Sequence, residues 1–368
     1  MKLLKADTRV LRRQFFAIGN EIYRDNPYYR STEDDLVRML INGPTLFHEH
    51  ARVLPYLMLE NDSVCGRFAF VHDEHMSDYV QVAFFEFKPD TGNPVSIIEN
   101  EAQTLFPNAD KIVFGLQGHL NYGAGFLLNR FDQVPVFGLP YSLPHYPGLF
   151  EGYTERKMHS FRFSMQVDIP LFERLSERMA GNEITVRKLD MKNLKKDIHL
   201  YTELNNRCFT EHPYWTDREG KEDFELFESF RHLLRPENFL FAMHQGREVG
   251  FLMWFPDFNQ MIKNDRELKC STAFSLDVLR FRYANPIKQF RLTEIAVLPE
   301  YRSKGAELAM MFQMTKDVLA AGYKEGVGGF IFEENRDSIN LALRYVERFT
   351  GKKAQNDAEF AAYEKKLQ

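Results

Sequence analysis

The chain has 368 residues, of which 44% are hydrophobic and 27% are charged, and its formal net charge is −5 at pH 7. This length and balance predict a soluble globular protein with two domains of ordinary size. The acidic charge argues against a nucleic-acid partner, which usually requires a basic stripe. No apolar run reaches the roughly 20 residues that span a bilayer, and we recognise no secretory signal. We therefore expect a cytoplasmic protein without a membrane partner.

In chain order, the first half begins with helical patterns and continues with strands, a helix and a loop-rich segment. We predict helices over 8–24 and 31–40, strands over 52–60, 63–73 and 79–87, a helix over 94–106, a strand over 111–118, loops and short elements over 122–153, and a strand over 160–169. The short segment NDS (61–63) favours a tight hairpin.

The second half repeats this order of elements. We predict a strand over 183–190, helices over 193–209 and 222–234, a hairpin over 238–255, a long polar and aromatic connection over 256–288, a strand over 289–298, a helix over 306–322, a strand over 326–334, a helix over 337–349 and a short strand over 359–366. The repeated order indicates a structural duplication, with domains over 1–170 and 182–368 and a boundary near 170–181.

Metal sites and disulfides are not indicated. Cys65, Cys208 and Cys270 lie far apart without C-x-x-C spacing, so the cysteines predict neither a disulfide framework nor a zinc site. The histidines of HEH (48–50) and HDEH (72–75) are of a type that binds metals, but no third ligand set with suitable spacing accompanies them. We interpret both motifs as surface or supporting polar groups and predict no metal.

The stretch EIAVLPEYRSKGAEL (294–308) is the most informative segment. A strand runs directly into an amphipathic helix, whose first turn leaves backbone N–H groups unpaired. Gly305 lets a ligand approach the backbone, and Arg302 and Lys304 add positive charge at the positive end of the helix dipole. This combination predicts an anion site of the kind that binds pyrophosphate. An ordinary strand-to-helix turn remains the alternative.

With these residues, AVLPEYRSKGAELAMM (296–311) resembles the acyl-CoA loop of the GNAT superfamily of N-acyltransferases, whose pattern is R/Q-x-x-G-x-G/A. The sequence departs from the pattern at Glu307, where the family has Gly or Ala. The chain as a whole resembles bacterial proteins with two fused GNAT-like domains, over 23–29, 47–51, 65–75, 82–87, 125–151, 247–260 and 298–305. The resemblance implies an α+β fold with two tandem domains, each a mixed, mostly antiparallel splayed sheet flanked by helices.

The resemblance also implies a function. The chain would move an acyl group, by expectation acetyl, from acetyl-CoA or another acyl-CoA to a small-molecule or peptide amine. Ile295, Ala296 and Val297 would pair with the pantetheine arm of the cofactor. Its remaining contacts would come from Arg302, Ser303, Lys304, Gly305, Ala306, Glu307 and Asn335.

Glu294 is the candidate general base, because it stands just before the cofactor-pairing residues. A solvated or ion-paired strand carboxylate is the alternative interpretation. The family's acidic Tyr would fall at Ala342, two helical turns after Asn335. Tyr345, one turn further, is the candidate acid, and a core or surface role is its alternative.

The first half has KPDTGNPV (88–95) where the cofactor loop would be. This segment lacks the Arg, and Asp90 would repel phosphate, so we expect this half to be degenerate. We predict instead that the loop 125–151 and the segment 256–259 line a shared cavity. The candidate substrate-binding residues there are Tyr141, His145, Tyr146, Asp257 and Asn259.

Two further functions stay open at this point. One is a non-catalytic GNAT-like ligand-binding protein, in which Glu307 and the displaced Tyr345 have abolished transfer. The other is an acyltransferase that uses a longer-chain or carrier-protein thioester. The chain contains 34 Phe and 16 Tyr residues, which either fill the cores or line an apolar pocket. The sequence predicts no oligomeric state.

Overall fold

The computed structural model describes residues 1–30, 34–167, 170–171, 174, 183–261, 280–281, 283–302 and 304–367. Ser303, Cys270 and most of the proposed boundary near 170–181 lie outside these residues, so the division into domains stays a prediction. None of the described helices is long and apolar enough to cross a membrane.

The first half contains three helices and seven strands within the described residues. They are β1 (Lys2–Lys5), α1 (Arg9–Ile22), α2 (Asp34–Asn42), β2 (Ala51–Glu60), β3 (Ser63–Asp73), β4 (Tyr79–Phe87), α3 (Val95–Leu105), β5 (Lys111–Phe114), β6 (Phe126–Leu127) and β7 (Thr154–Ser164). Thr8 caps α1, because its hydroxyl accepts from the Leu11 N–H. The sequence pattern predicted β3 and β4 to the residue, but it missed β1, and its strand over 160–169 overlaps β7 only in part.

The second half repeats the order. Its elements are β8 (Ile184–Lys188), α5 (Leu194–Cys208), α6 (Gly220–Ser229), β9 (Phe239–His244), β10 (Arg247–Pro256), β11 (Gln289–Val297), α9 (Ala306–Ala320), β12 (Glu325–Phe332), α10 (Arg336–Thr350) and β13 (Gln355–Lys366). Gly351 ends α10 in the left-handed conformation, with φ 65°. The expectation of a short last strand was wrong, since β13 has 12 residues.

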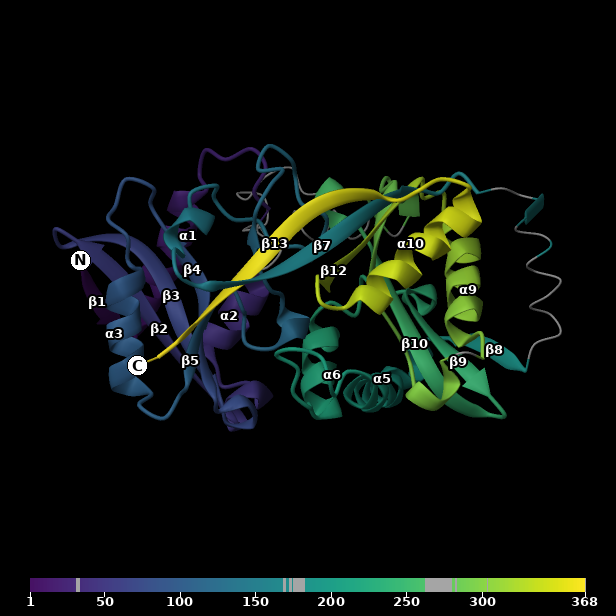
Figure 1. The fold of residues 1–368 in the computed structure, drawn as a ribbon, viewed down its shortest axis with the longest axis horizontal. Helices are drawn as coiled ribbons and strands as arrows, with labels where there is room; N and C mark the ends of the chain where they lie inside the picture. The colour runs from purple at the N-terminus through teal and green to yellow at the C-terminus, as the bar shows by residue number, and fades with distance from the viewer. Residues whose placement is uncertain are drawn as a thin grey trace.

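The strands form one mixed sheet with the order β1-β2-β3-β4-β5-β13-β7-β12-β11-β10-β9-β8, and β6 pairs with β13. The pairs β4–β5 and β11–β12 are parallel. The other pairs among the described strands are antiparallel. This confirms the α+β fold with a mostly antiparallel sheet. Helices cover the sheet in both halves (Figure 1).

The two halves exchange their last strands. β7, at the end of the first half, pairs with β12, and the C-terminal β13 pairs with β5 of the first half. β7 and β13 also pair with each other, and they run side by side across the middle of the molecule (Figure 1). This exchange explains the length of β13. Its sequence contains few β-branched residues, but strands on both sides satisfy its backbone.

β11 and β12 separate part of the way along their length. Their parallel pairing runs from Gln289↔Glu325 to Leu292↔Gly328. Beyond Leu292, β11 stays paired with β10, whereas β12 stays paired with β7. A bulge between Met253 and Trp254 of β10 leaves Thr293 as the extra residue of β11. The central strands of this half are therefore splayed, as expected.

Candidate active site

A cavity of about 340 Å³ opens where β11 and β12 separate, a size typical of small-molecule sites. Its walls come from β10, β11, β12, α5, α6, α9 and α10 of the second half. The first half contributes α2 and the segments 120–123 and 137–138. The cavity is thus shared between the two halves. Most of its lining side chains are apolar.

Glu294 lies on the wall of this cavity, opposite Met253 of β10. Its Oε2 accepts hydrogen bonds from the Tyr201 hydroxyl at 3.0 Å and from Asn205 Nδ2 at 3.1 Å. Tyr201 in turn accepts a hydrogen bond from Asn121 Nδ2 of the first half at 3.1 Å. These bonds fix the carboxylate at the point where the two halves meet.

The Glu294 side chain is half-buried at the cavity wall. Burial raises the pKa of Glu294, while the hydrogen bonds from Tyr201 and Asn205 and the nearby Arg218 and Arg291 act in the opposite direction. No ion pair involves Glu294 within the described part of the chain. Among the described residues Glu294 is thus hydrogen-bonded and not ion-paired, and its role as a base stays a prediction. A raised pKa brings the group closer to the range in which a general base is effective.

The segment after β11 turns into α9 at Gly305, whose φ of 84° lies in the left-handed region. No side chain caps this helix among the described residues, so its first N–H groups face outward from the turn. Arg302 Nε donates to the Val297 carbonyl at 3.3 Å, which places the guanidinium beside the helix start. Glu307, in the first turn, is among the residues that line the cavity.

The predicted pantetheine-pairing residues form one edge of the opening. Ala296 and Ile295 pair with Phe251 and Leu252 of β10, so their other edge faces the gap left by β12. Ile295 lines the cavity, and so does Asn335. Asn335 is the N-cap of α10, because its Oδ1 accepts from the Ser338 N–H at 3.1 Å.

Tyr345 of α10 also lines the cavity. Its hydroxyl lies 3.5 Å from the Leu308 carbonyl of α9, and its ring stacks on Phe349 with centroids 4.2 Å apart. Burial raises the pKa of Tyr345 well above its ordinary value, so the hydroxyl keeps its proton. Ala342, one turn earlier, lines the cavity as well. Tyr345 is therefore packed in the core and faces the cavity at the same time.

Several solved structures have a similar arrangement of helices and strands. A tandem GNAT protein from the clavulanic acid biosynthesis pathway superposes with a TM-score of 0.55 and 9% identity, covering 100% of this chain and 99% of that chain. A glucosamine N-acetyltransferase region of a fungal multi-domain GH3 β-N-acetylglucosaminidase gives 0.57 and 11%, covering 99% of this chain and 38% of that chain. A GCN5-related N-acetyltransferase from Sphaerobacter thermophilus gives 0.50 and 12%, covering 100% and 96%.

The chain has the tandem GNAT fold. The resemblance read from the sequence is confirmed at the level of the fold. No family model matches the chain, and no curated protein matches it in sequence. Identities of this size establish architecture alone, so the roles of individual residues must be argued from the geometry.

The predicted substrate-binding residues lie away from the cavity wall. Tyr146 is fully buried, and its hydroxyl accepts from the Phe87 N–H at 3.0 Å and donates to Glu86 at 2.7 Å. The Tyr141 hydroxyl donates to the Phe131 carbonyl at 2.7 Å. The His145 ring packs edge-on against that of Tyr146, with centroids 4.5 Å apart. These three side chains support the fold of the first half.

Asp257 and Asn259 do contact the loop 125–151, but they bind its backbone. Asp257 Oδ1 accepts from the Phe137 N–H at 2.8 Å, and Asn259 Nδ2 donates to the Pro135 carbonyl at 2.8 Å. Burial raises the pKa of Asp257 to about 6. The loop and the segment 256–259 are thus close together, as expected. Only Phe137 and Gly138 of this region reach the cavity.

Tyr201, which lines the cavity, and Asn205, which binds Glu294, were missed in the sequence. They stand four residues apart on α5, so both polar tips lie on one face of the helix. That spacing, on an otherwise apolar stripe, was the available signal. The segment Leu120–Gly123 belongs to the glycine-rich stretch 115–125, whose irregular backbone suits a pocket-shaping loop. It lines the cavity with Asn121 and Tyr122.

The first half lacks the corresponding carboxylate. The parallel pairing of β4 with β5 ends at Val82↔Phe114, as that of β11 with β12 ends at Leu292↔Gly328. Two residues further along, β4 has Phe84 where β11 has Glu294. The Phe84 N–H donates to Gln117 Oε1 at 2.8 Å, so a side chain of the protein occupies the strand edge that a ligand would need.

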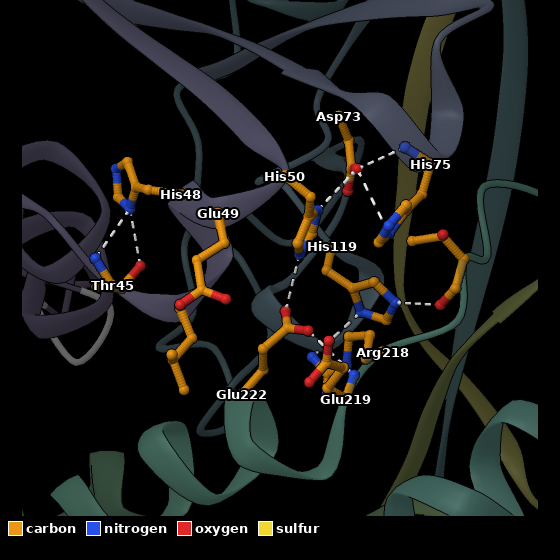
Figure 2. A network of polar contacts seen from close by, with 12 residues as sticks. Thr45, His48, Glu49, His50, Asp73, His75, His119, Arg218, Glu219 and Glu222 are labelled. Atoms are coloured by element: carbon orange, nitrogen blue, oxygen red, sulfur yellow. Dashed lines mark hydrogen bonds and ion pairs between the residues drawn. The ribbon is translucent and has the colours of Figure 1, made fainter.

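The motifs HEH and HDEH meet between the two halves (Figure 2). His50 Nδ1 lies 2.9 Å from Asp73 Oδ1, and His50 Nε2 lies 3.1 Å from Glu222 Oε2 of α6. Both ring nitrogens must donate to bind two carboxylates, so His50 carries a proton on each. These hydrogen bonds raise the pKa of His50 to about 10. The imidazolium thus ties β3 of the first half to α6 of the second.

Among the described residues, His50, Asp73 and His75 have ligand atoms within 4.8 Å of one another. The two rings stack with centroids 4.3 Å apart and planes 16° from parallel. A metal ion binds in the plane of each imidazole, and two nearly parallel planes do not meet at a shared ion. The arrangement suits a proton shared with carboxylates better than a metal.

We expect His50→Leu to lower the free energy of unfolding by about 3 kcal/mol at pH 7, because Asp73 and Glu222 stay buried without their partner. The pKa of His50 is higher in the folded state, so its contribution is complete below the unfolded value near 6.5 and is lost as the pH rises through about 10. Urea unfolding at pH 7 and 10.5 measures this, with His75→Leu as the control. If the difference in the free energy of unfolding between the wild type and His50→Leu were as large at pH 10.5 as at pH 7, the shared-proton arrangement would be contradicted.

Proposed function

We propose that the protein is an N-acyltransferase that moves an acyl group, acetyl by expectation, from acyl-CoA to a small-molecule or peptide amine. The observation that carries this proposal is the half-buried, hydrogen-bonded Glu294 in a cavity between splayed strands. The fold supports the reaction class, since solved structures with the same architecture are described as N-acetyltransferases. A cytoplasmic location remains a prediction of the sequence.

The second half would hold the cofactor. Ile295, Ala296 and Val297 offer the free edge of β11 to the pantetheine arm. The outward N–H groups that follow Gly305, among them that of Ala306, and the charges of Arg302 and Lys304 suit the pyrophosphate. Ser303 lies outside the described residues, and its role stays a prediction.

Two glycines support the proposal that the second half holds the cofactor. A Cβ on Gly328, the last residue of β12 that pairs with β11, would meet nothing within 4 Å, so space is open at the cavity wall. Gly305 has the positive φ that brings backbone close to a ligand. In the first half the equivalent strand edge is closed by Gln117, which favours a single cofactor site per chain.

The reaction follows from the groups on the wall. Glu294 accepts a proton from the ammonium form of the acceptor, and Tyr201 and Asn205 hold the carboxylate in place. The neutral amine attacks the thioester carbonyl carbon, so a C–N bond forms and the C–S bond breaks. The attacking nitrogen loses its second proton to solvent as the C–S bond breaks, while Tyr345 supplies a proton to the departing thiolate and regains one from solvent. The net products are an amide, free CoA and one proton, which Glu294 releases to water.

The anion site can be tested with three variants. We expect Arg302→Ala to weaken CoA binding about tenfold through the loss of a charge-assisted contact, and Gly305→Val to weaken it further through backbone strain. Glu307→Ala should leave binding unchanged or tighten it, because a carboxylate beside phosphate is repulsive. Calorimetric titration with CoA measures all three. If Glu307→Ala abolished binding while Arg302→Ala had no effect, the stretch would be only a strand-to-helix turn.

A thiol-release assay tests transfer itself. Acetyl-CoA is mixed with the protein and a panel of amines, and free CoA is measured over time. Amine-dependent release is the expected result. Tight CoA binding without release for any amine would favour the non-catalytic alternative.

A further inference from the structure

The side of the cavity formed by both halves has a distinct chemistry. We call it the acceptor limb and define it by Phe137, Trp215, Leu226, Phe227, Phe230 and Phe255. The four phenylalanines pack ring against ring as a continuous aromatic wall, and Trp215 and Leu226 also line the cavity. The rings of Phe230 and Phe255 have centroids 6.0 Å apart, and those of Phe137 and Phe255 are 6.5 Å apart. Phe227 continues the wall to Tyr201, which binds Glu294.

The acceptor limb has no charged side chain that could bind a charged group of the substrate. Apart from Glu294 and Glu307, the charged residue among the described cavity-lining residues is Arg291. Arg291 is buried, and its Nε donates to the Gly329 carbonyl at 2.9 Å. Burial lowers the pKa of His212, so this residue is neutral near pH 7. Arg291 is engaged with the Gly329 and Phe137 carbonyls, Glu307 stands at the start of α9, and none of the six limb residues is charged. A carboxylate or a second ammonium within the limb would therefore lose its hydration without gaining an oppositely charged limb residue.

Two polar donors on the cavity lining, Trp215 in the limb and Thr293 on β11, lack a partner among the described residues. Trp215 Nε1 and Thr293 Oγ1 are buried, and neither has a hydrogen-bond partner in the described part of the chain. Both residues line the cavity. Buried donors of this kind are normally satisfied. A neutral oxygen on a bound molecule would satisfy them without adding charge.

From these observations we propose that the acceptor is a primary amine on a neutral, mainly aromatic or apolar body, with at most a hydroxyl-like polar group. Its ammonium faces Glu294, and its body occupies the acceptor limb. This inference rests on the proposed function. It excludes amino acids with a free carboxylate, polyamines and highly hydroxylated amines as preferred acceptors.

Matched probes test the proposal without turnover. We expect 2-phenylethylamine to bind the full chain, measured by calorimetry, at least tenfold more tightly than phenylalanine, which adds one carboxylate. Tyramine, which adds one hydroxyl, should bind at least as well as 2-phenylethylamine, and spermidine should show no saturable binding. Equal binding of phenylalanine, or preference for spermidine, would overturn the proposal.

Two variants locate the binding. Leu226→Arg places a cation in the limb and should reduce 2-phenylethylamine affinity at least tenfold, whereas Val134→Arg, at an exposed position, adds the same charge without that effect. Trp215→Phe keeps the aromatic surface and should remove any advantage of tyramine. If Leu226→Arg fails to fold, Trp215→Phe still tests whether the amine binds in the limb. Amine binding unchanged by both limb variants would contradict the assignment.

Failure of this inference can be told from failure of the proposed function. Acetyl-CoA binding without binding of any aromatic amine would overturn the acceptor class alone. Amine binding without CoA binding or transfer would overturn the acyltransferase proposal and leave the limb assignment intact. If octanoyl-CoA bound more tightly than acetyl-CoA and displaced 2-phenylethylamine, the limb would hold an acyl chain instead.

Discussion

Glu294→Gln is expected to reduce kcat for acyl transfer by 10²- to 10⁴-fold, the range that a positioned general base contributes. The amide keeps the shape of the side chain and can still accept a hydrogen bond from Tyr201, so the fold should be retained. Thiol release from acetyl-CoA, measured from pH 5 to 9, is the assay. In the wild type, activity should rise with pH as Glu294 ionises, at a pH above the ordinary value of a glutamate because burial raises its pKa. The variant should lack this dependence.

The same substitution should stabilise the protein. The pKa of Glu294 is higher in the folded state than in the unfolded state, so the native state binds the proton more tightly. That stabilising contribution is complete below the unfolded value near 4.3 and is lost as the pH rises through the folded value. At pH 7.5 we therefore expect the free energy of unfolding of Glu294→Gln to exceed that of the wild type by about 1 kcal/mol.

Glu86→Gln provides a matched control for Glu294. Glu86 is a strand carboxylate of the first half that accepts hydrogen bonds from Tyr23 at 2.6 Å and from Tyr146 at 2.7 Å. It lies outside the cavity, so its substitution should change kcat by less than about twofold. If Glu86→Gln and Glu294→Gln reduced activity equally, the loss would come from the fold and not from a base.

Gly328→Leu should abolish acyl transfer, with a loss of at least about 100-fold, while the protein stays folded. A Cβ at this position meets nothing within 4 Å, and the residue lines the cavity, so the new side chain extends into the space between β11 and β12. Strand glycines contribute no packing, so the free energy of unfolding should change by less than about 1 kcal/mol. CoA titration and thermal unfolding measure the two effects.

Gly148→Leu is the corresponding control, because a Cβ there also meets nothing within 4 Å and the residue is exposed away from the cavity. It should retain activity. Full activity in Gly328→Leu, with its fold intact, would show that the gap between β11 and β12 is not where the substrates bind.

Local pattern was enough to predict most elements of this fold. The strands over 63–73 and 79–87 follow from β-forming residues bounded by turn residues, and the helix that starts after Gly305 follows from its apolar stripe. Arg302 and Gly305 carried the resemblance to the GNAT loop, and longer stretches such as 125–151 carried the resemblance to tandem GNAT proteins. The splay of β11 from β12 agrees with both.

The rest depends on contacts between residues far apart in sequence. β7 pairs with β12 of the second half and β13 pairs with β5 of the first half. Each strand could pair equally well with the free edge of its own half, and no local sequence pattern decides between the two partners. His50 and Glu222 are 172 positions apart, so their pairing could not be read from HEH alone. The acceptor side was assigned to Tyr141 and its neighbours because aromatic loop residues resemble a pocket lining. In the structure these side chains instead satisfy backbone groups of the first half.

The most direct test is the stoichiometry of acetyl-CoA binding by the wild-type chain in a calorimetric titration. The account predicts one site per chain, formed by the splayed edge of β11 and the start of α9 in the second half, and no site in the first half, where Gln117 closes the equivalent edge. The same titration with Gly328→Leu should show no binding. Two sites per chain, no binding by the wild type, or one site that survives in Gly328→Leu would contradict it.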